Sequence, residues 1–90
     1  MKILICDDDA LWTERCREKL NLLAHKNNIN IEIQSAASGS ELLFFIDSKY
    51  ADTDLIYMDI HMPEPDGMET ARRLRSLNLH LDIVFYTKDI

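Results

Sequence analysis

The sequence has no hydrophobic run long enough to cross a membrane and no excess of basic residues. A membrane-spanning helix needs about 18 or more successive apolar residues. The first apolar run is interrupted at Asp7, so we expect no secretory signal peptide and a cytoplasmic domain without membrane contact. The formal net charge is -6 and the pI is about 4.8. A nucleic-acid surface requires clustered Lys and Arg, so we expect no direct nucleic acid contact by this domain.

Cysteine is also scarce, since the chain contains only Cys6 and Cys16. Their spacing matches neither a metal-binding nor a redox motif, and we expect two reduced thiols. The length of 90 residues is that of one small domain. Because the net charge is -6, metal cations are more natural partners of this chain than nucleic acids are.

Two short apolar segments end in aspartate. Residues 2–6 lead directly into Asp7, Asp8 and Asp9, and residues 55–58 lead into Asp59. Near-continuous apolar runs of this length are typical of parallel strands covered on both faces, and ligands bind such sheets at the carboxyl ends of the strands. One aspartate, Asp9, is explained as a helix cap. Because capping does not explain why a second strand also ends in an acid, we predict a shared acidic site.

The remaining segments alternate between helical and strand patterns. Helices are expected over 10–26, after Ser38 and after Asp66, where apolar residues recur every three or four positions. A half-polar edge strand is expected over 29–34, a link over 49–53 and a fourth strand over 82–87. This alternation predicts an α/β fold with a parallel sheet. The expected helical stripes are Trp12, Cys16, Leu20 and Leu23; Leu42, Leu43, Phe45 and Ile46; and Met68, Ala71, Leu74 and Leu77.

In combination, three stretches resemble a response-regulator receiver domain of two-component systems. They are ILICDDD at 3–9, DIHMPEPDG at 59–67 and the strand that ends in Thr87. The opening KILICDDD and the closing DIVFYTKDI are most similar to regulators with a LytTR-type DNA-binding output. The resemblance implies a flavodoxin-like open parallel sheet of strand order 2-1-3-4 for residues 1–90. It also implies a switch domain rather than an enzyme.

The resemblance further implies roles for individual residues. Asp59 is the expected phosphoacceptor, receiving a phosphoryl group from a sensor histidine kinase with Mg²⁺ or Mn²⁺ as cofactor. Asp8 and Asp59 would bind the ion directly, the backbone carbonyl of His61 would be a third ligand, and Asp7 would act through water. The hydroxyl of Thr87 would contact the phosphoryl group. Three neighbouring carboxylates repel one another, so at least one of their pKa values is expected to rise without a cation.

Simpler interpretations stay open for several of these residues. Thr87 is also explained as a β-branched residue that packs at the end of a strand. His61 is also explained as an exposed loop side chain, and Asp66 is best explained as a helix cap. Two other functions are open as well. One is a Mg²⁺-dependent phosphatase or phosphotransferase, which usually has a second acid where this chain has His61, and the other is an unphosphorylated dimerisation or interaction module.

The chain departs from the family pattern after the fourth strand. A full receiver continues through a further helix, a fifth strand preceded by a phosphoryl-binding Lys, and a last helix, whereas this sequence stops at Ile90. Lys88 could substitute for that Lys or crowd the site. The fourth strand would then be an apolar edge, and such edges pair with other chains. We therefore expect a homo-oligomer that buries residues 83–86, in a domain incomplete at its C-terminus.

Overall fold

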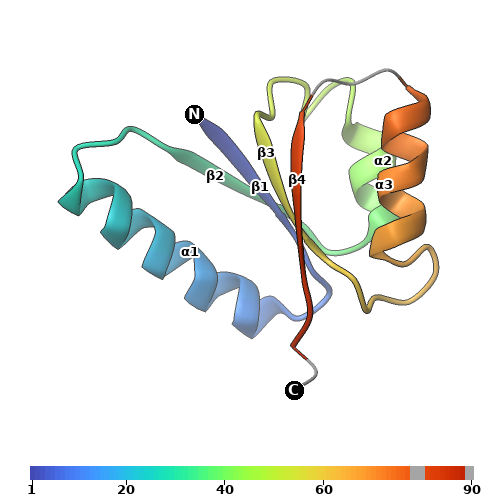
Figure 1. Cartoon of the computed structure of the whole chain (residues 1–90), viewed down its shortest axis with the longest axis horizontal. Coiled ribbons are helices and arrows are strands. Elements are labelled where there is room, and N and C mark those ends of the chain that lie inside the picture. Colours follow the sequence, from blue (N-terminus) through green and yellow to red (C-terminus); the bar gives the residue numbers. More distant parts are fainter. Residues whose placement is uncertain (78–80, 89–90) are drawn as a thin grey trace.

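The described part of the chain forms one parallel sheet flanked by three helices (Figure 1). The computed structural model describes residues 1–77 and 81–88. The two last residues of the stretch that suggested a LytTR-type output, 89 and 90, lie outside them. The expected α/β fold is confirmed. In chain order the elements are β1 (Lys2–Cys6), α1 (Ala10–Lys26), β2 (Glu32–Ala36), α2 (Gly39–Phe45), β3 (Leu55–Asp59), α3 (Gly67–Ser76) and β4 (Asp82–Tyr86).

The strand order is β2-β1-β3-β4, as the resemblance implied. All three pairings are parallel, so the carboxyl ends of the strands lie along one side of the sheet. The register pairs Cys6 with Met58 and Asp59 with Tyr86. The residues that follow β1, β3 and β4 are thereby brought together, because these strands are neighbours.

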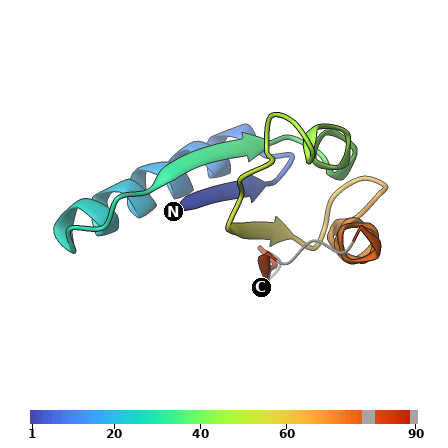
Figure 2. The same cartoon turned by 90° about the horizontal axis from the view of Figure 1, so that it is seen from above.

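The two faces of the sheet are covered by different helices. Helix α1 lies on one side, and α2 and α3 lie together on the other (Figures 1 and 2). Alternate strand residues face the α2 and α3 side, where full burial of each large aliphatic side chain contributes about 1.5–3 kcal/mol. The main core on this side consists of Leu4, Cys6, Ala36, Leu42, Ile46, Tyr50, Ile56, Met58, Met62 and Leu74.

Each helix begins at a polar capping residue. The side chain of Asp9 accepts a hydrogen bond from the backbone N–H of Trp12 at 3.0 Å. Asp66 accepts one from the N–H of Glu69 at 2.9 Å, and Ser38 caps α2 in the same way. The caps expected at Asp9 and Asp66 are thus confirmed. Each satisfies a backbone donor that the helix itself leaves without a partner.

Some sequence expectations were wrong in detail. Strand β2 begins at Glu32 instead of Ile29, because the N–H of Ile29 bonds the carbonyl of Ala24 at 2.8 Å and closes the end of α1. Asn28 allows this closure with a positive φ of 54°. Thr87 lies just beyond the last residue of β4.

Three members of the expected helical stripes are exposed instead of buried. They are Leu23 of α1, Met68 of α3 and Leu77, which follows α3. The buried face of α3 consists of Gly67, Thr70, Ala71 and Leu74. It is shifted from the expected face because the first turn packs through Gly67 against β3, which turns Met68 outward.

Two further expectations concern the thiols and membranes. Both Cys6, which is buried, and Cys16 are free cysteines, as expected. Among residues 1–77 and 81–88, no helix has the length and apolar character required to cross a bilayer.

Candidate functional site

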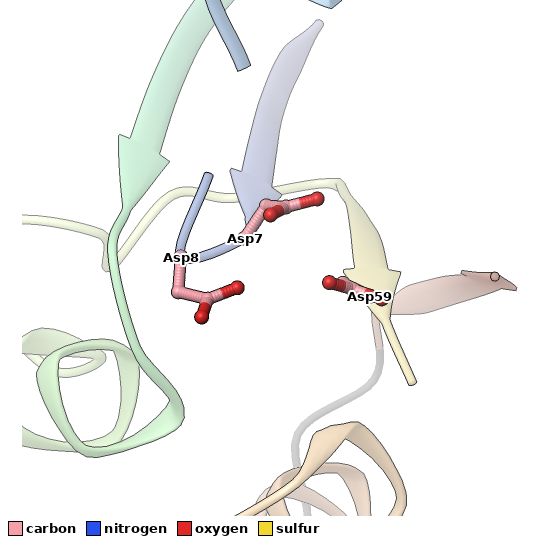
Figure 3. Close-up of side chains that lie close together, drawn as sticks. All are labelled: Asp7, Asp8 and Asp59. Carbon is pink, nitrogen blue, oxygen red and sulfur yellow. The ribbon is translucent and has the colours of Figure 1, made fainter. Parts of the chain in front are cut away.

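Three aspartates converge at the carboxyl ends of β1 and β3 (Figure 3). Asp7 and Asp8 follow β1 directly, and Asp59 is the last residue of β3. One carboxylate oxygen from each lies within 4.8 Å of the others. Asp7 and Asp59 are only 2% and 1% exposed, whereas Asp8 faces solvent. The structure therefore brings Asp59 together with Asp7 and Asp8, which lie about fifty residues earlier in the sequence.

Hydrogen bonds from the backbone orient the two buried carboxylates. Oδ1 of Asp7 accepts from the N–H of Asp9 at 2.8 Å, and Oδ1 of Asp59 accepts from the N–H of His61 at 3.1 Å. The hydroxyl of Tyr86 donates to Oδ2 of Asp7 at 2.5 Å. Bonds of this kind stabilise a buried carboxylate, and they fix the direction in which its other lone pairs point.

Lys88 places a positive charge among these acids. Its Nζ lies 3.0 Å from both carboxylate oxygens of Asp7. It is also 3.7 Å from Oδ2 of Asp9 and 3.7 Å from Oδ2 of Asp59. The side chain is 30% exposed, so these contacts are partly shielded from water. The side chain of Lys88 therefore points toward the acidic cluster.

The pKa of Asp59 is raised, as expected for at least one acid of the cluster. Burial is the largest cause, and the charges of Asp7 and Asp8 act in the same direction. The His61 N–H and the charge of Lys88 oppose the shift. Desolvation therefore outweighs the hydrogen bond, and the site favours any group that adds positive charge to it.

The pKa values of residues beside the cluster are shifted as well. Partial burial alone lowers the pKa of Lys88, but its hydrogen bonds to Asp7 and the nearby acidic charges outweigh burial and raise that pKa. Burial, followed by the bond to Asp7, raises the pKa of Tyr86. Burial and the charge of Asp7 raise the pKa of the Cys6 thiol to about 12. Both Tyr86 and Cys6 are thus held in their protonated forms.

The donor set fits a hard divalent cation. All three side chains offer carboxylate oxygens, which are the ligands that Mg²⁺ prefers, and Mg²⁺ takes only a few protein ligands while retaining several waters. The exposed Asp8 leaves one side of the cluster open to solvent. Asp7, Asp8 and Asp59 could therefore hold a hydrated ion.

Two other predicted residues lie next to the cluster. His61 is two residues beyond Asp59 in the loop after β3, and its side chain is exposed, as one interpretation expected. Thr87 directly follows β4 and is also exposed. Backbone pairing brings this end of β4 to β3, because the N–H of Ile60 donates to the carbonyl of Tyr86 at 3.0 Å.

Close packing of α3 against β3 fixes the backbone at Asp59. A Cβ added at Gly67 would lie 2.2 Å from the carbonyl oxygen of Asp59 and 2.9 Å from the Cα of Ile60. Only glycine permits this approach without displacement of the backbone. The dipeptide Asp66-Gly67 thus begins α3 and also sets the distance of the helix from the candidate site.

Tyr86 is the site residue that the sequence analysis missed. Its ring stacks on Trp12 of α1 at 4.5 Å between centroids, while its hydroxyl reaches Asp7. The available signal was its position at the carboxyl end of a strand beside the one that ends in Asp59. That signal is weak, because Tyr is a common residue in any strand.

Comparisons with known proteins agree with this fold. Residues 3–90 match the family model described as "Response regulator receiver domain". The chain is 36% identical over 87 residues to "Response regulator MprA" of Mycobacterium avium, covering 97% of this chain and 35% of the relative. It is 33% identical over 87 residues to "Positive alginate biosynthesis regulatory protein" of Pseudomonas aeruginosa, covering 97% and 33%. The chain therefore spans about a third of the length of these curated relatives.

Solved structures show the same architecture. A MaeR response regulator bound to beryllium trifluoride superposes with a TM-score of 0.82 at 20% identity, covering all of this chain and 69% of that one. The chemotaxis protein CheY4 of Vibrio cholerae gives a TM-score of 0.75 at 26% identity, covering 99% and 69%.

These findings define the chain as a flavodoxin-like α/β domain with an acidic site at the carboxyl edge of its sheet. The chain belongs to the response regulator receiver domain family of two-component systems. Domains of this family are generally signalling switches rather than enzymes, and they act with histidine kinases. The LytTR-type output stays a prediction.

Proposed function

We propose that this chain is a phosphoacceptor that receives a phosphoryl group on Asp59 from a sensor histidine kinase. The observation that carries the proposal is the convergence of Asp7, Asp8 and Asp59 within 4.8 Å. One of these acids is a buried carboxylate at the end of a strand, held in position by a backbone hydrogen bond. Phosphoryl transfer requires mainly positioning and neutralisation of charge, and a small acidic pocket with a cation provides both.

In the proposed reaction a carboxylate oxygen of Asp59 attacks the phosphorus atom of the kinase's phosphohistidine. A P–O bond forms as the P–N bond breaks, and the electron pair of that bond returns to the imidazole nitrogen. Oδ1 of Asp59 is engaged by the His61 N–H, so Oδ2 is the better placed nucleophile. The product is an aspartyl phosphate at the solvent-accessible edge of the sheet.

Asp8 and Asp59 would bind Mg²⁺ directly, with the backbone carbonyl of His61 as a third ligand and Asp7 acting through water. When bound, the ion supplies positive charge that offsets the negative charge of the transferring phosphoryl group. Asp7 and Asp59 are held by backbone N–H groups, so these ligands are oriented before binding. Exposure of Asp8 gives the ion and its waters access from solvent.

Thr87 is the proposed switch residue, because it follows β4 directly beside the end of β3. A new phosphoryl group on Asp59 adds negative charge and hydrogen-bond acceptors. The Thr87 hydroxyl would donate to one phosphoryl oxygen and shift the end of β4. A local change in charge would thus become a change in the surface presented to other domains.

A small acyl phosphate provides a direct test without the kinase. Incubation with acetyl phosphate and Mg²⁺ should add the mass of one phosphoryl group to the intact chain. The added mass should be absent without Mg²⁺ and in Asp59→Asn, but present in Asp47→Asn, which changes an exposed acid after α2. Added mass that persists in Asp59→Asn would contradict the assignment of the phosphoacceptor.

We also propose that the chain associates with a second copy through β4, which has no further strand beside it within residues 1–77 and 81–88. This strand is last in the sheet order, and its Val84 and Phe85 are 43% and 38% exposed. An apolar edge strand presents backbone donors and acceptors that a second strand can pair with. Sedimentation should show a dimer or larger species that Val84→Lys weakens and that Leu22→Lys, at an exposed site on α1, leaves intact.

A further inference from the structure

The ammonium group of Lys88 lies against both carboxylate oxygens of Asp7. Its Nζ is equidistant, at 3.0 Å, from the two carboxylate oxygens of this residue. It also lies 3.7 Å from Asp59, which belongs to a different strand. A single positive charge thus lies beside two of the three acids of the cluster.

Asp7 has no acceptor capacity to spare while these contacts are made. A carboxylate offers about four lone-pair sites. On Asp7 the N–H of Asp9 and the ammonium of Lys88 use Oδ1, and the hydroxyl of Tyr86 and the same ammonium use Oδ2. Asp7 can coordinate a metal ion, or accept a hydrogen bond from a water bound to that ion, only after one of these donors leaves.

Among these donors, Lys88 is the one that can leave. The N–H of Asp9 is fixed at the start of α1, and Tyr86 is held in place by stacking on Trp12 at 4.5 Å. Lys88 carries a flexible side chain that is 30% exposed. Its Nζ also lies 5.2 Å from the centroid of the Trp12 ring, so movement of this group changes the surroundings of the indole.

We propose that Lys88 is an internal competitor for the divalent cation and so sets the metal affinity of the site. In the metal-free chain its ammonium neutralises Asp7 and Asp59, and the ion binds as Lys88 releases Asp7. The proposal rests on the proposed function, because it concerns the same acidic site. Lys88 would thus determine how readily the metal-free site takes up the cation.

The test is calorimetric titration of the whole chain with MgCl₂, comparing wild type with Lys88→Met. Methionine keeps an unbranched, flexible side chain but removes the charge. Lys88→Gln is a second variant of the same kind. The matched control is Lys26→Met, which removes one positive charge at the far end of α1, about 24 Å along the helix from Ala10. Circular dichroism establishes that each variant is folded before titration.

Wild type should bind Mg²⁺, and Lys88→Met should bind it roughly tenfold more tightly, the factor that corresponds to one charge-assisted hydrogen bond. Lys26→Met should match wild type. Fluorescence of Trp12, the only tryptophan, gives a second readout. Mg²⁺ should change the Trp12 emission in wild type, because the Lys88 ammonium moves away from the indole ring. The change should be much smaller in Lys88→Met, because this variant has no ammonium group beside the ring.

Equal or weaker Mg²⁺ binding by Lys88→Met would overturn the role of Lys88 while leaving the acidic site in place. Tighter binding by Lys26→Met to the same degree would also overturn it, because overall charge would then explain the effect. Failure of every variant to bind Mg²⁺ would overturn both this inference and the metal site of the proposed function.

Discussion

The hydroxyl of Tyr86 donates a 2.5 Å hydrogen bond to Oδ2 of Asp7, joining residues 79 positions apart in the chain. This contact links the last residue of β4 to the acid that follows β1, across the end of β3. Tyr86 immediately precedes Thr87, the proposed switch residue. The end of β4 is therefore in direct contact with the acidic cluster.

Tyr86→Phe should destabilise the chain by about 1–2 kcal/mol, because it removes a hydrogen bond to a buried carboxylate and keeps the ring that stacks on Trp12. Urea denaturation at neutral pH measures the effect. Tyr57→Phe, which removes a hydroxyl from β3, is the control and should change stability less. Equal losses in the two variants would show that the contact with Asp7 contributes nothing specific.

Tyr50 should make stability depend on alkaline pH. Burial, with a smaller contribution from the charge of Glu41, raises the pKa of this phenol from 10.0 to about 12. A raised pKa means that the folded state holds the proton more tightly than the unfolded state does. The contribution of the neutral phenol is therefore fully present below pH 10 and is lost as pH rises toward 12.

Absorbance of tyrosinate during titration checks this expectation. Wild type should show a tyrosine that ionises near pH 12 and that is missing from Tyr50→Phe. The same variant should be less stable at pH 7, since the Tyr50 hydroxyl donates to the carbonyl of Ser35 at 2.9 Å. Ionisation of Tyr50 at the ordinary value would mean that the phenol is not buried in this way.

Gly67→Ala should destabilise the chain by about 1–3 kcal/mol, as overpacking of a close contact does. The added Cβ would meet the carbonyl oxygen of Asp59, so α3 or the end of β3 must shift. Met68→Ala, at the exposed next position, should have a much smaller effect. Thermal melting of the two variants gives the comparison, and equal melting temperatures would contradict the close approach of α3.

Asp66→Ala should remove the N-cap of the same helix and lower stability by about 1 kcal/mol. Asp66→Ser should restore most of this loss, because a serine hydroxyl can accept from the N–H of Glu69 in the same way. Circular dichroism during urea denaturation measures both variants. A serine variant no more stable than the alanine variant would indicate that Asp66 acts other than as a cap.

The order of elements and the position of the acids could be predicted because the relevant signals are local. Two apolar runs end in aspartate, each helix begins at Asp or Ser, and the strands alternate with helices. Once β1 and β3 are neighbours, Asp7 and Asp59 must lie at the same edge of the sheet. The polar alternation of residues 29–34 likewise indicated that β2 lies at an edge, which is confirmed.

Contacts between distant segments could not be predicted in this way. The sequence places Tyr50 in a link, because its neighbours show no periodic apolar pattern. In the structure this residue is 1% exposed and belongs to the main core. The bond from Tyr86 to Asp7 depends on the register of β4 against β3 and on which face Tyr86 occupies. The inward contacts of Lys88 depend on the same register, so the sequence left two roles open for it.

The acidic site itself is tested most directly by thermal melting with and without Mg²⁺, in wild type and in Asp8→Asn. Asp8 is exposed, so this variant should fold normally while losing one ligand. Wild type should be stabilised by roughly 1–3 kcal/mol at Mg²⁺ concentrations well above Kd, and Asp8→Asn much less, with NaCl at matched ionic strength as the control. An unchanged melting temperature in wild type, or an equal rise in Asp8→Asn, would contradict a metal site formed by Asp7, Asp8 and Asp59.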